Sequence, residues 1–170
     1  MTQQFISSSG FLHCDEPPIS FLTMDPQQHP VESPVSFGRR CAVLNLDLMS
    51  ILIDPVTDTD EGHAFLSSCV RRNDAVHRKD PRPLTIFTSL FFSTPIQAEL
   101  AHHDAPFTVL VRSFDTFQAS FPGVQIDSRF VVDEKDIVLQ KTRWYAGAGN
   151  ALEQILRAQT IDTVVIVSTN

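Results

Sequence analysis

Residues 141–170, KTRWYAGAGNALEQILRAQTIDTVVIVSTN, carry the pattern that decides the fold. The segment predicts the end of a strand, a loop, a helix capped by Asn150, and a second buried strand over 163–168. Four residues of this helix share one face: Leu152, Ile155, Leu156 and Gln159. A strand–helix–strand unit of this length is typical of a parallel α/β sheet with right-handed crossovers.

The chain upstream repeats the alternation of strands and helices. CAVLNLDLMS at 41–50 and LTIFTSLFF at 84–92 have the apolar density of strands that are buried on both faces, and DIVLQK at 136–141 predicts a third strand. Between the first two, Asp58 and Glu61 form a capping-box-like start for an amphipathic helix. We therefore predict an α/β fold in which ligands bind beyond the carboxyl ends of the strands.

The chain divides into two parts by composition. Residues 1–38 contain five prolines among Ser, Gln and acidic residues, and proline removes backbone donors and fixes φ. We expect an irregular Pro/Ser-rich extension there. Residues 39–170 have the length and apolar content of one α/β domain with a single core.

Composition excludes several classes of function. The formal net charge of −7 disfavours a nucleic-acid-binding surface, which needs clustered Lys and Arg. No segment has the length and apolarity of a membrane span, and the N-terminus has no basic region before an apolar run, so we expect no membrane association and no secretory signal. The three cysteines form neither a disulfide framework nor a metal knuckle. We predict a cytoplasmic protein.

Asp47 and Lys141 each lie at the end of a predicted strand. A carboxylate in an apolar strand is costly to bury unless it is paired, so Asp47 is either functional or a structural cap for a neighbouring backbone amide. Lys141 could supply a positive charge to Asp47 across the carboxyl edge of the sheet. The alternative is a lysine that extends from a strand end into water.

Trp144 and Tyr145 follow shortly after Lys141 and are the single Trp and the single Tyr of the chain. Aromatic residues in a loop at the carboxyl end of a strand are suitable as walls of a substrate pocket, and equally as loop packing. The nearby Gly147-Ala148-Gly149 is not a dinucleotide-binding fingerprint, because it lacks the third glycine and an acidic ribose partner.

Metal and thiol chemistry receive little support. His102-His103-Asp104 is the most metal-like cluster, but adjacent histidines in a strand point to opposite faces. Cys41 and Cys69 have no activating neighbour in sequence and are expected to be inert core thiols. We expect no metal and no cofactor.

Two segments resemble the isochorismatase-like cysteine hydrolase superfamily. LNLDLMS at 44–50 resembles the family's first strand, in which an Asp closes an apolar run. VLQKTRWYAGAGNALEQILRAQTIDTVVIV at 138–167 resembles its later lysine segment with the helix and strand that follow. The resemblance covers about residues 40–170, and the order and spacing of the two motifs carry it.

The resemblance implies a Rossmann-like three-layer α/β/α fold with a parallel sheet and a dimer or larger assembly. It also implies a Cys–Asp–Lys triad that hydrolyses small amides such as nicotinamide or carbamoyl compounds. Asp47 matches the family's general base and Lys141 its lysine, while the nucleophile follows the fourth strand at a helix N-terminus. Trp144 and Tyr145 would then line the pocket.

The sequence departs from the family at several places. No cysteine follows the strand at 163–168, and Leu48, Met49 and Ser50 replace the polar residues that usually follow the Asp. The metal-binding Asp/His set of nicotinamidases has no clear match. We therefore expect a chain truncated on its C-terminal side before the nucleophile loop, with uncertain catalytic competence.

The same departure suggests partners. In a truncated sheet, residues 164–167 would form an apolar edge strand without a partner, which favours homo-oligomers or association with a longer paralogue. The alternative to a hydrolase of amide C–N bonds is thus a non-catalytic relative that binds a small ligand or docks on another subunit.

Overall fold

The computed structural model describes residues 2–4, 38–100, 105–114 and 117–168. Its centre is a five-stranded sheet in the order β1-β5-β2-β3-β4, and every pairing is parallel. The strands are β1 (Thr2–Gln4), β2 (Cys41–Leu46), β3 (Leu84–Leu90), β4 (Ile137–Lys141) and β5 (Thr163–Ser168). The parallel α/β sheet expected from the sequence is confirmed.

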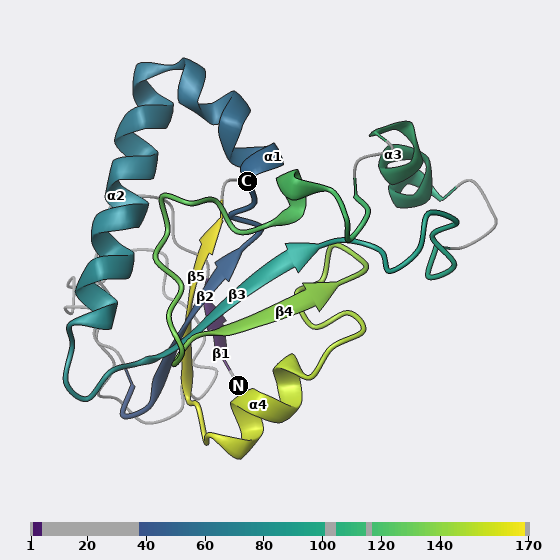
Figure 1. The fold of residues 1–170 in the computed structure, drawn as a ribbon. Helices are drawn as coiled ribbons and strands as arrows, with labels where there is room; N and C mark the ends of the chain where they lie inside the picture. Colours follow the sequence, from purple (N-terminus) through teal and green to yellow (C-terminus); the bar gives the residue numbers. More distant parts are fainter. Residues whose placement is uncertain (1, 5–37, 101–104, 115–116, 169–170) are drawn as a thin grey trace, which may run out of the picture.

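Helices cover both faces of the sheet, as Figure 1 shows. The long helix α2 lies on one face, α4 lies on the other, and α3 stands apart near the carboxyl end of β3. The helices are α1 (Ser50–Ile53), α2 (Asp60–His77), α3 (Pro106–Phe114) and α4 (Leu152–Ala158), with 3₁₀ turns η1 (Asp54–Asp58) and η2 (Pro122–Val124). These three layers confirm the α/β/α architecture.

The central strands are mainly apolar because each one contributes to two cores. Side chains alternate between faces along a strand. On one face, strand residues pack with Leu66 and Cys69 of α2: Val43, Phe87, Val165 and Val167. On the other face, strand residues pack with Leu152 and Leu156 of α4: Ala42, Leu44, Ile86, Val164 and Ile166. The burial on both faces predicted from the strand sequences is therefore confirmed.

Helix α2 starts later than the sequence predicted. Its N-cap is Thr59, whose Oγ1 accepts a hydrogen bond from the Gly62 amide at 3.0 Å. The expected Asp58–Glu61 capping box is wrong, because the 3₁₀ turn η1 continues through Asp58. A Cβ at Gly62 would lie 1.7 Å from the Val56 carbonyl oxygen, so this tight entry requires glycine.

The loop between β4 and α4 is pinned by one side chain. Asn150 Nδ2 donates to the carbonyls of Gln140 and Ala146, each at 2.8 Å, and Oδ1 accepts from the Leu152 amide at 3.0 Å. The helix N-cap is Ala151, one residue later than predicted, although Asn150 still satisfies a free amide of the first turn. These bonds hold the segment after Lys141 close to the end of β4.

Strand β5 has neighbours on both sides over half its length. Its residues Thr163–Val165 pair with Thr2–Gln4 of β1, and Cys41–Leu46 of β2 pair along its other side. The expectation that 164–167 would form an edge without a partner is therefore wrong where β1 pairs. The expectation of an irregular N-terminal extension rested on its prolines. Residues 2–4 precede the first proline, Pro17, so no proline prevents them from pairing as a strand.

The strand order places the candidate site. The chain moves outward from β2 to β3 and β4, then returns through α4 to β5 on the other side of β2. The connections after β2 and β4 cross opposite faces of the sheet (Figure 1). The carboxyl ends of β2 and β5 therefore flank the topological switch point, where ligands bind in open α/β sheets.

No helix in the described part of the chain has both the length and the apolarity needed to span a membrane.

Candidate active site

Asp47 occupies a strained position at the switch point. It directly follows β2 and has a φ of 55°, in the left-handed region that few residues other than glycine adopt. Its backbone amide donates to the Thr88 carbonyl at 3.2 Å, and the residue is only 6% exposed. Strained non-glycine backbone persists only where its surroundings hold it, and it concentrates at functional sites.

Lys141 meets Asp47 across the carboxyl edge of the sheet. Its Nζ lies 2.6 Å from Asp47 Oδ2 and also donates to the Trp144 carbonyl at 3.1 Å. Lys141 is 2% exposed, so the interpretation of a lysine extending into water is wrong. The two residues belong to β4 and the end of β2, with β3 between them, and the long lysine side chain bridges this gap.

Burial makes this pair interdependent. Each charge would be costly inside the protein without the other, because the interior replaces little of the lost hydration. The contact compensates both charges. A carboxylate placed beside a cation in this way can act as a general base toward a group that enters the switch point.

Thr88 completes what we call the carboxyl-edge site: Asp47, Thr88 and Lys141. Its Oγ1 donates to Asp47 Oδ1 at 3.1 Å and accepts from the Asp47 amide at 3.3 Å, and the residue is fully buried. Sequence reasoning missed Thr88. The available signal was a hydroxyl near the carboxyl end of a buried strand, but Thr85 and Ser89 in the same strand carry hydroxyls too.

Trp144 contacts this site through its backbone carbonyl, whereas its side chain is exposed to solvent. The carbonyl that binds Lys141 belongs to Trp144, whereas the residue as a whole is 58% exposed. Its indole meets the Phe107 ring edge-on at 5.0 Å between centroids, and the Arg143 guanidinium lies 5.9 Å from the Phe107 centroid. This cluster forms an exposed aromatic rim next to Lys141.

Tyr145 is engaged elsewhere. Its hydroxyl donates to Glu153 Oε1 at 2.6 Å, and this bond is the main reason that the pKa of Tyr145 is raised. Its ring also lies close to Gly147, where a Cβ would come within 2.9 Å of it. Tyr145 thus links the loop to the first turn of α4, although it is still 55% exposed.

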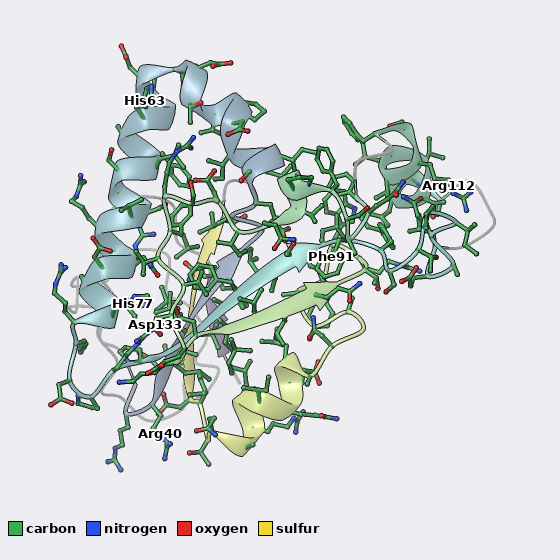
Figure 2. The ribbon with its side chains drawn as sticks, viewed as in Figure 1. Arg40, His63, His77, Phe91, Arg112 and Asp133 are labelled. Atoms are coloured by element: carbon green, nitrogen blue, oxygen red, sulfur yellow. The ribbon has the colours of Figure 1, made fainter. Side chains whose placement is uncertain are left out.

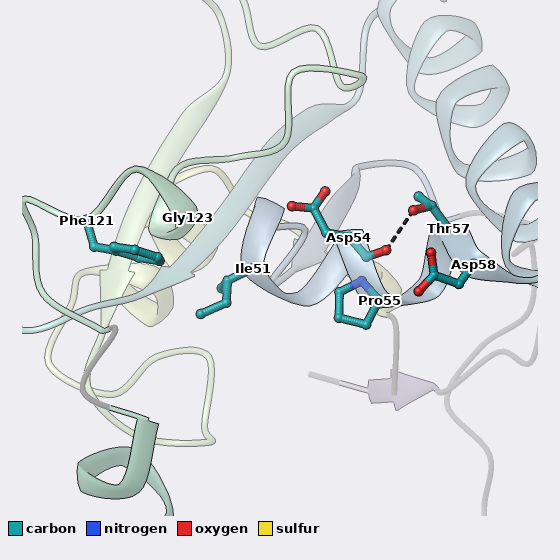
Figure 3. A pocket seen from close by; sticks show the side chains of 7 residues that line it. All are labelled: Ile51, Asp54, Pro55, Thr57, Asp58, Phe121 and Gly123. Atoms are coloured by element: carbon teal, nitrogen blue, oxygen red, sulfur yellow. Dashed lines mark hydrogen bonds between the residues drawn. The ribbon is translucent and has the colours of Figure 1, made fainter.

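An open pocket of about 590 Å³ lies on the helical segment that follows β2, and Figure 3 shows the side chains that line it. Its lining residues are Ile51, Asp54, Pro55, Thr57, Asp58, Phe121 and Gly123. The carboxyl-edge site contributes none of them. One wall is partly neutralised, because Arg129 Nη2 lies 3.6 Å from Asp54 Oδ1.

A second charged cluster lies at the opposite, amino edge of the sheet. Figure 2 shows His77 and Asp133 together near the end of α2. We call it the amino-edge cluster: His77, Arg82, Asp133 and Asp136. The ligand atoms of the histidine and the two carboxylates lie within 4.8 Å of one another, but Arg82 donates to both carboxylates. The cluster is therefore an ion-pair network in which one guanidinium partly compensates two carboxylates.

The other candidates from the sequence have separate outcomes. Cys69 lies on the buried face of α2, and burial raises the pKa of its thiol, as expected for an inert cysteine. Cys41 is half-buried at the start of β2. His102-His103-Asp104 and Cys14 lie outside the described residues.

The fold and the site together define a class: an α/β protein with a buried carboxylate–ammonium pair at its topological switch point. A model of the isochorismatase domain matches residues 41–167, which is well over half of the chain. The chain therefore belongs to the isochorismatase family, as the resemblance of its two motifs predicted. Among curated proteins, none matches the chain significantly.

Solved structures with this fold are similar in shape and distant in sequence. An isochorismatase family protein from Desulfovibrio vulgaris is 14% identical with a TM-score of 0.61, covering 78% of this chain and 68% of its own. An isochorismatase-like hydrolase from Alkaliphilus metalliredigens is 15% identical with a TM-score of 0.56, covering 77% and 66%. N-carbamoylsarcosine amidase from Thermoplasma acidophilum is 19% identical with a TM-score of 0.55, covering 76% and 67%.

The chain spans between 58% and 71% of the length of the similar solved structures. At these identities the likeness concerns the fold.

Proposed function

We propose that, in a product that continues past Asn170 and carries the nucleophile there, the carboxyl-edge site hydrolyses a small amide-type C–N bond, with Asp47 as general base and Lys141 as its charge partner. The observation that carries the proposal is the 2.6 Å contact between Lys141 Nζ and Asp47 Oδ2, buried at the switch point. In this reaction water adds across the C–N bond, releasing an acid and an amine or ammonia.

Geometry supports a nucleophile on the chain that follows β5. Leu46 and Ser168 are register partners, so β5 ends beside the strand that leads into Asp47. Asp47 would take the proton of that nucleophile as it attacks the carbonyl carbon, and give it to the nitrogen as the C–N bond breaks. Water would then attack the acyl group left on the nucleophile, release the acid and restore the nucleophile with its proton. Lys141 would place its positive charge against Asp47 Oδ2 during the transfer.

The aromatic rim supports a small substrate with a flat group. Trp144 offers an exposed indole face beside the carbonyl that binds Lys141, which suits the wall of a pocket. Tyr145 is proposed for the same wall, through the exposed part of its ring, although its hydroxyl is bound to Glu153. Proteins with similar folds include N-carbamoylsarcosine amidase and a pyrazinamidase, so a carbamoyl compound and pyrazinamide are the first compounds to test.

Substitution of the proposed base tests this function. In the Asp47→Asn variant we expect release of ammonia from a carbamoyl compound or pyrazinamide to fall by roughly 10²–10⁴-fold, the usual contribution of a general base. Asp58→Asn is the matched control, because it removes an exposed carboxylate that lines the separate pocket. Equal activity of the wild type and Asp47→Asn would refute the assignment, and a loss in Asp58→Asn alone would move the site to the pocket.

A non-catalytic role is the second candidate, and the edge of β5 favours it. Strand β1 pairs only with Thr163–Val165, so within the described residues no strand pairs with Ile166 and Val167 on the side away from β2. Another copy of the chain or a longer paralogue could add a strand there. Light scattering would test self-association: a monomer at micromolar concentration would contradict the homo-oligomer.

A further inference from the structure

We propose that Thr88 is a positioning residue that fixes the direction of the Asp47 carboxylate. The inference rests on the proposed function for its kinetic consequence, whereas its structural consequence can be measured without any activity. Thr88 would not touch the substrate and would act through Asp47.

The hydrogen bonds between the two residues allow one arrangement of protons. Thr88 Oγ1 accepts the Asp47 amide at 3.3 Å, and its single proton points to Asp47 Oδ1 at 3.1 Å, because an ionised carboxylate only accepts. The Thr88 carbonyl accepts the same amide at 3.2 Å. One residue thus binds both the backbone and the side chain of Asp47.

The two oxygens of Asp47 have separate partners. Oδ1 is bound by Thr88 and Oδ2 by Lys141, from neighbouring strands on the same side of Asp47. Thr88 pairs with Leu139, two residues before Lys141, so the side chains of Thr88 and Lys141 project from the same face of the sheet. Two fixed donors stop the carboxylate from rotating and support the left-handed backbone at Asp47.

Other hydroxyls of β3 have ordinary structural partners. Thr85 Oγ1 donates to the Pro83 carbonyl at 3.4 Å, and Ser89 Oγ donates to the Val124 carbonyl. Both residues are as buried as Thr88. Thr88 differs because its hydroxyl binds a charged group whose direction matters for proton transfer. Thr85 therefore serves as a matched control for the loss of a buried hydroxyl in the same strand.

The experiment compares Thr88→Val, Thr88→Ser and Thr85→Val in the full chain, by crystal structure and by amide hydrolysis. Valine keeps the shape of threonine without the donor, while serine keeps the donor without the methyl group. We expect Asp47 in Thr88→Val to leave its positive φ or to turn Oδ1 away from residue 88, and Thr88→Ser to retain the native geometry. We expect kcat to fall roughly 10–100-fold in Thr88→Val with KM nearly unchanged, because a base misplaced by about 1 Å loses that much rate.

Two results would overturn the proposal: an Asp47 geometry in Thr88→Val identical to the wild type, or equal displacement of Asp47 in Thr85→Val. Thr88→Ala also lacks the hydroxyl and replaces Thr88→Val if the valine variant does not fold. If the wild type hydrolyses no amide, the proposed function fails, while the crystal structures still decide the role of Thr88.

Discussion

Strands β3 and β4 carry a charged cluster at each end, and the two clusters are built differently. At the amino edge, the Arg82 guanidinium spans two carboxylates, those of Asp133 and Asp136, in a planar fork that suits bidentate contacts. At the carboxyl edge, one ammonium meets one carboxylate. The amino-edge cluster connects residues that precede β3 and β4. The carboxyl-edge site connects the carboxyl ends of these two strands with Asp47, which follows β2.

Backbone strain separates the two clusters further, whereas exposure separates them only in part. The Asp133 side chain is 37% exposed and that of Asp136 is inaccessible, while both members of the Asp47–Lys141 pair are nearly inaccessible. Asp47 has a positive φ, and no residue of the amino-edge cluster has one. Strained non-glycine backbone concentrates at functional sites, so the strain at Asp47 supports the role proposed for the carboxyl-edge site.

Breaking the carboxyl-edge pair should have the largest effect on stability. Lys141→Met keeps most of the side-chain volume but leaves the Asp47 carboxylate buried without its cation. We expect the free energy of unfolding to fall by about 3–5 kcal/mol. Urea denaturation followed by circular dichroism measures this loss. The double variant Lys141→Met with Asp47→Asn should recover part of it, and additive losses would show that the two side chains are not coupled.

Breaking the amino-edge cluster should cost less and leave activity intact. Arg82→Met removes the guanidinium group that contacts Asp136. The Asp136 side chain is fully inaccessible and retains His77 Nε2 at 3.2 Å as a neighbour. We expect a loss of about 1–3 kcal/mol, the cost of removing hydrogen bonds to a charged group. The same urea titration measures it. A loss exceeding that of Lys141→Met would reverse the order of the comparison.

Acid should reveal a smaller contribution from the amino edge. The hydrogen bond from Arg82 is the main reason that the pKa of Asp133 is lowered to about 2. A lowered pKa stabilises the fold above the unfolded value of about 4, and this stabilisation is lost as the pH falls toward 2. Urea midpoints measured between these limits should therefore decline less steeply in Asp133→Asn than in the wild type. Asp58→Asn is the control, and parallel curves for all three proteins would contradict the assignment.

Much of the fold was predictable because local patterns and global packing agree. Apolar runs such as Val43–Leu44 and Val164–Val167 supply both faces of a sheet, so their composition alone predicts buried parallel strands. The start of α2 was not predictable, because the η1 turn decides that Thr59 rather than Asp58 is the N-cap. The pairing of β1 with β5 joins residues more than 150 positions apart, and no local pattern contains that information.

The candidate site was predictable to the level of residue type and position. Charged residues at the ends of apolar strands are expensive unless paired, which singled out Asp47 and Lys141. The sequence predicted the same two possible roles for Trp144 and Tyr145, a wall of the pocket or packing within the loop. Their different environments, a carbonyl bound by Lys141 and a hydroxyl bound to Glu153, depend on how the loop folds back on β4 and α4.

The sequence by itself determined the α/β class, the positions of the main strands and the family, because these follow from periodicity, apolar density and two motifs. Only the tertiary structure decided that Lys141 reaches Asp47 across an intervening strand, that Thr88 binds the other carboxylate oxygen, and that Asp47 adopts a left-handed backbone. The physical reason is that these contacts join residues that lie far apart along the chain. Periodicity records which face of an element is buried, whereas contacts between strands depend on their order and register, and these are set by the packing of the whole domain.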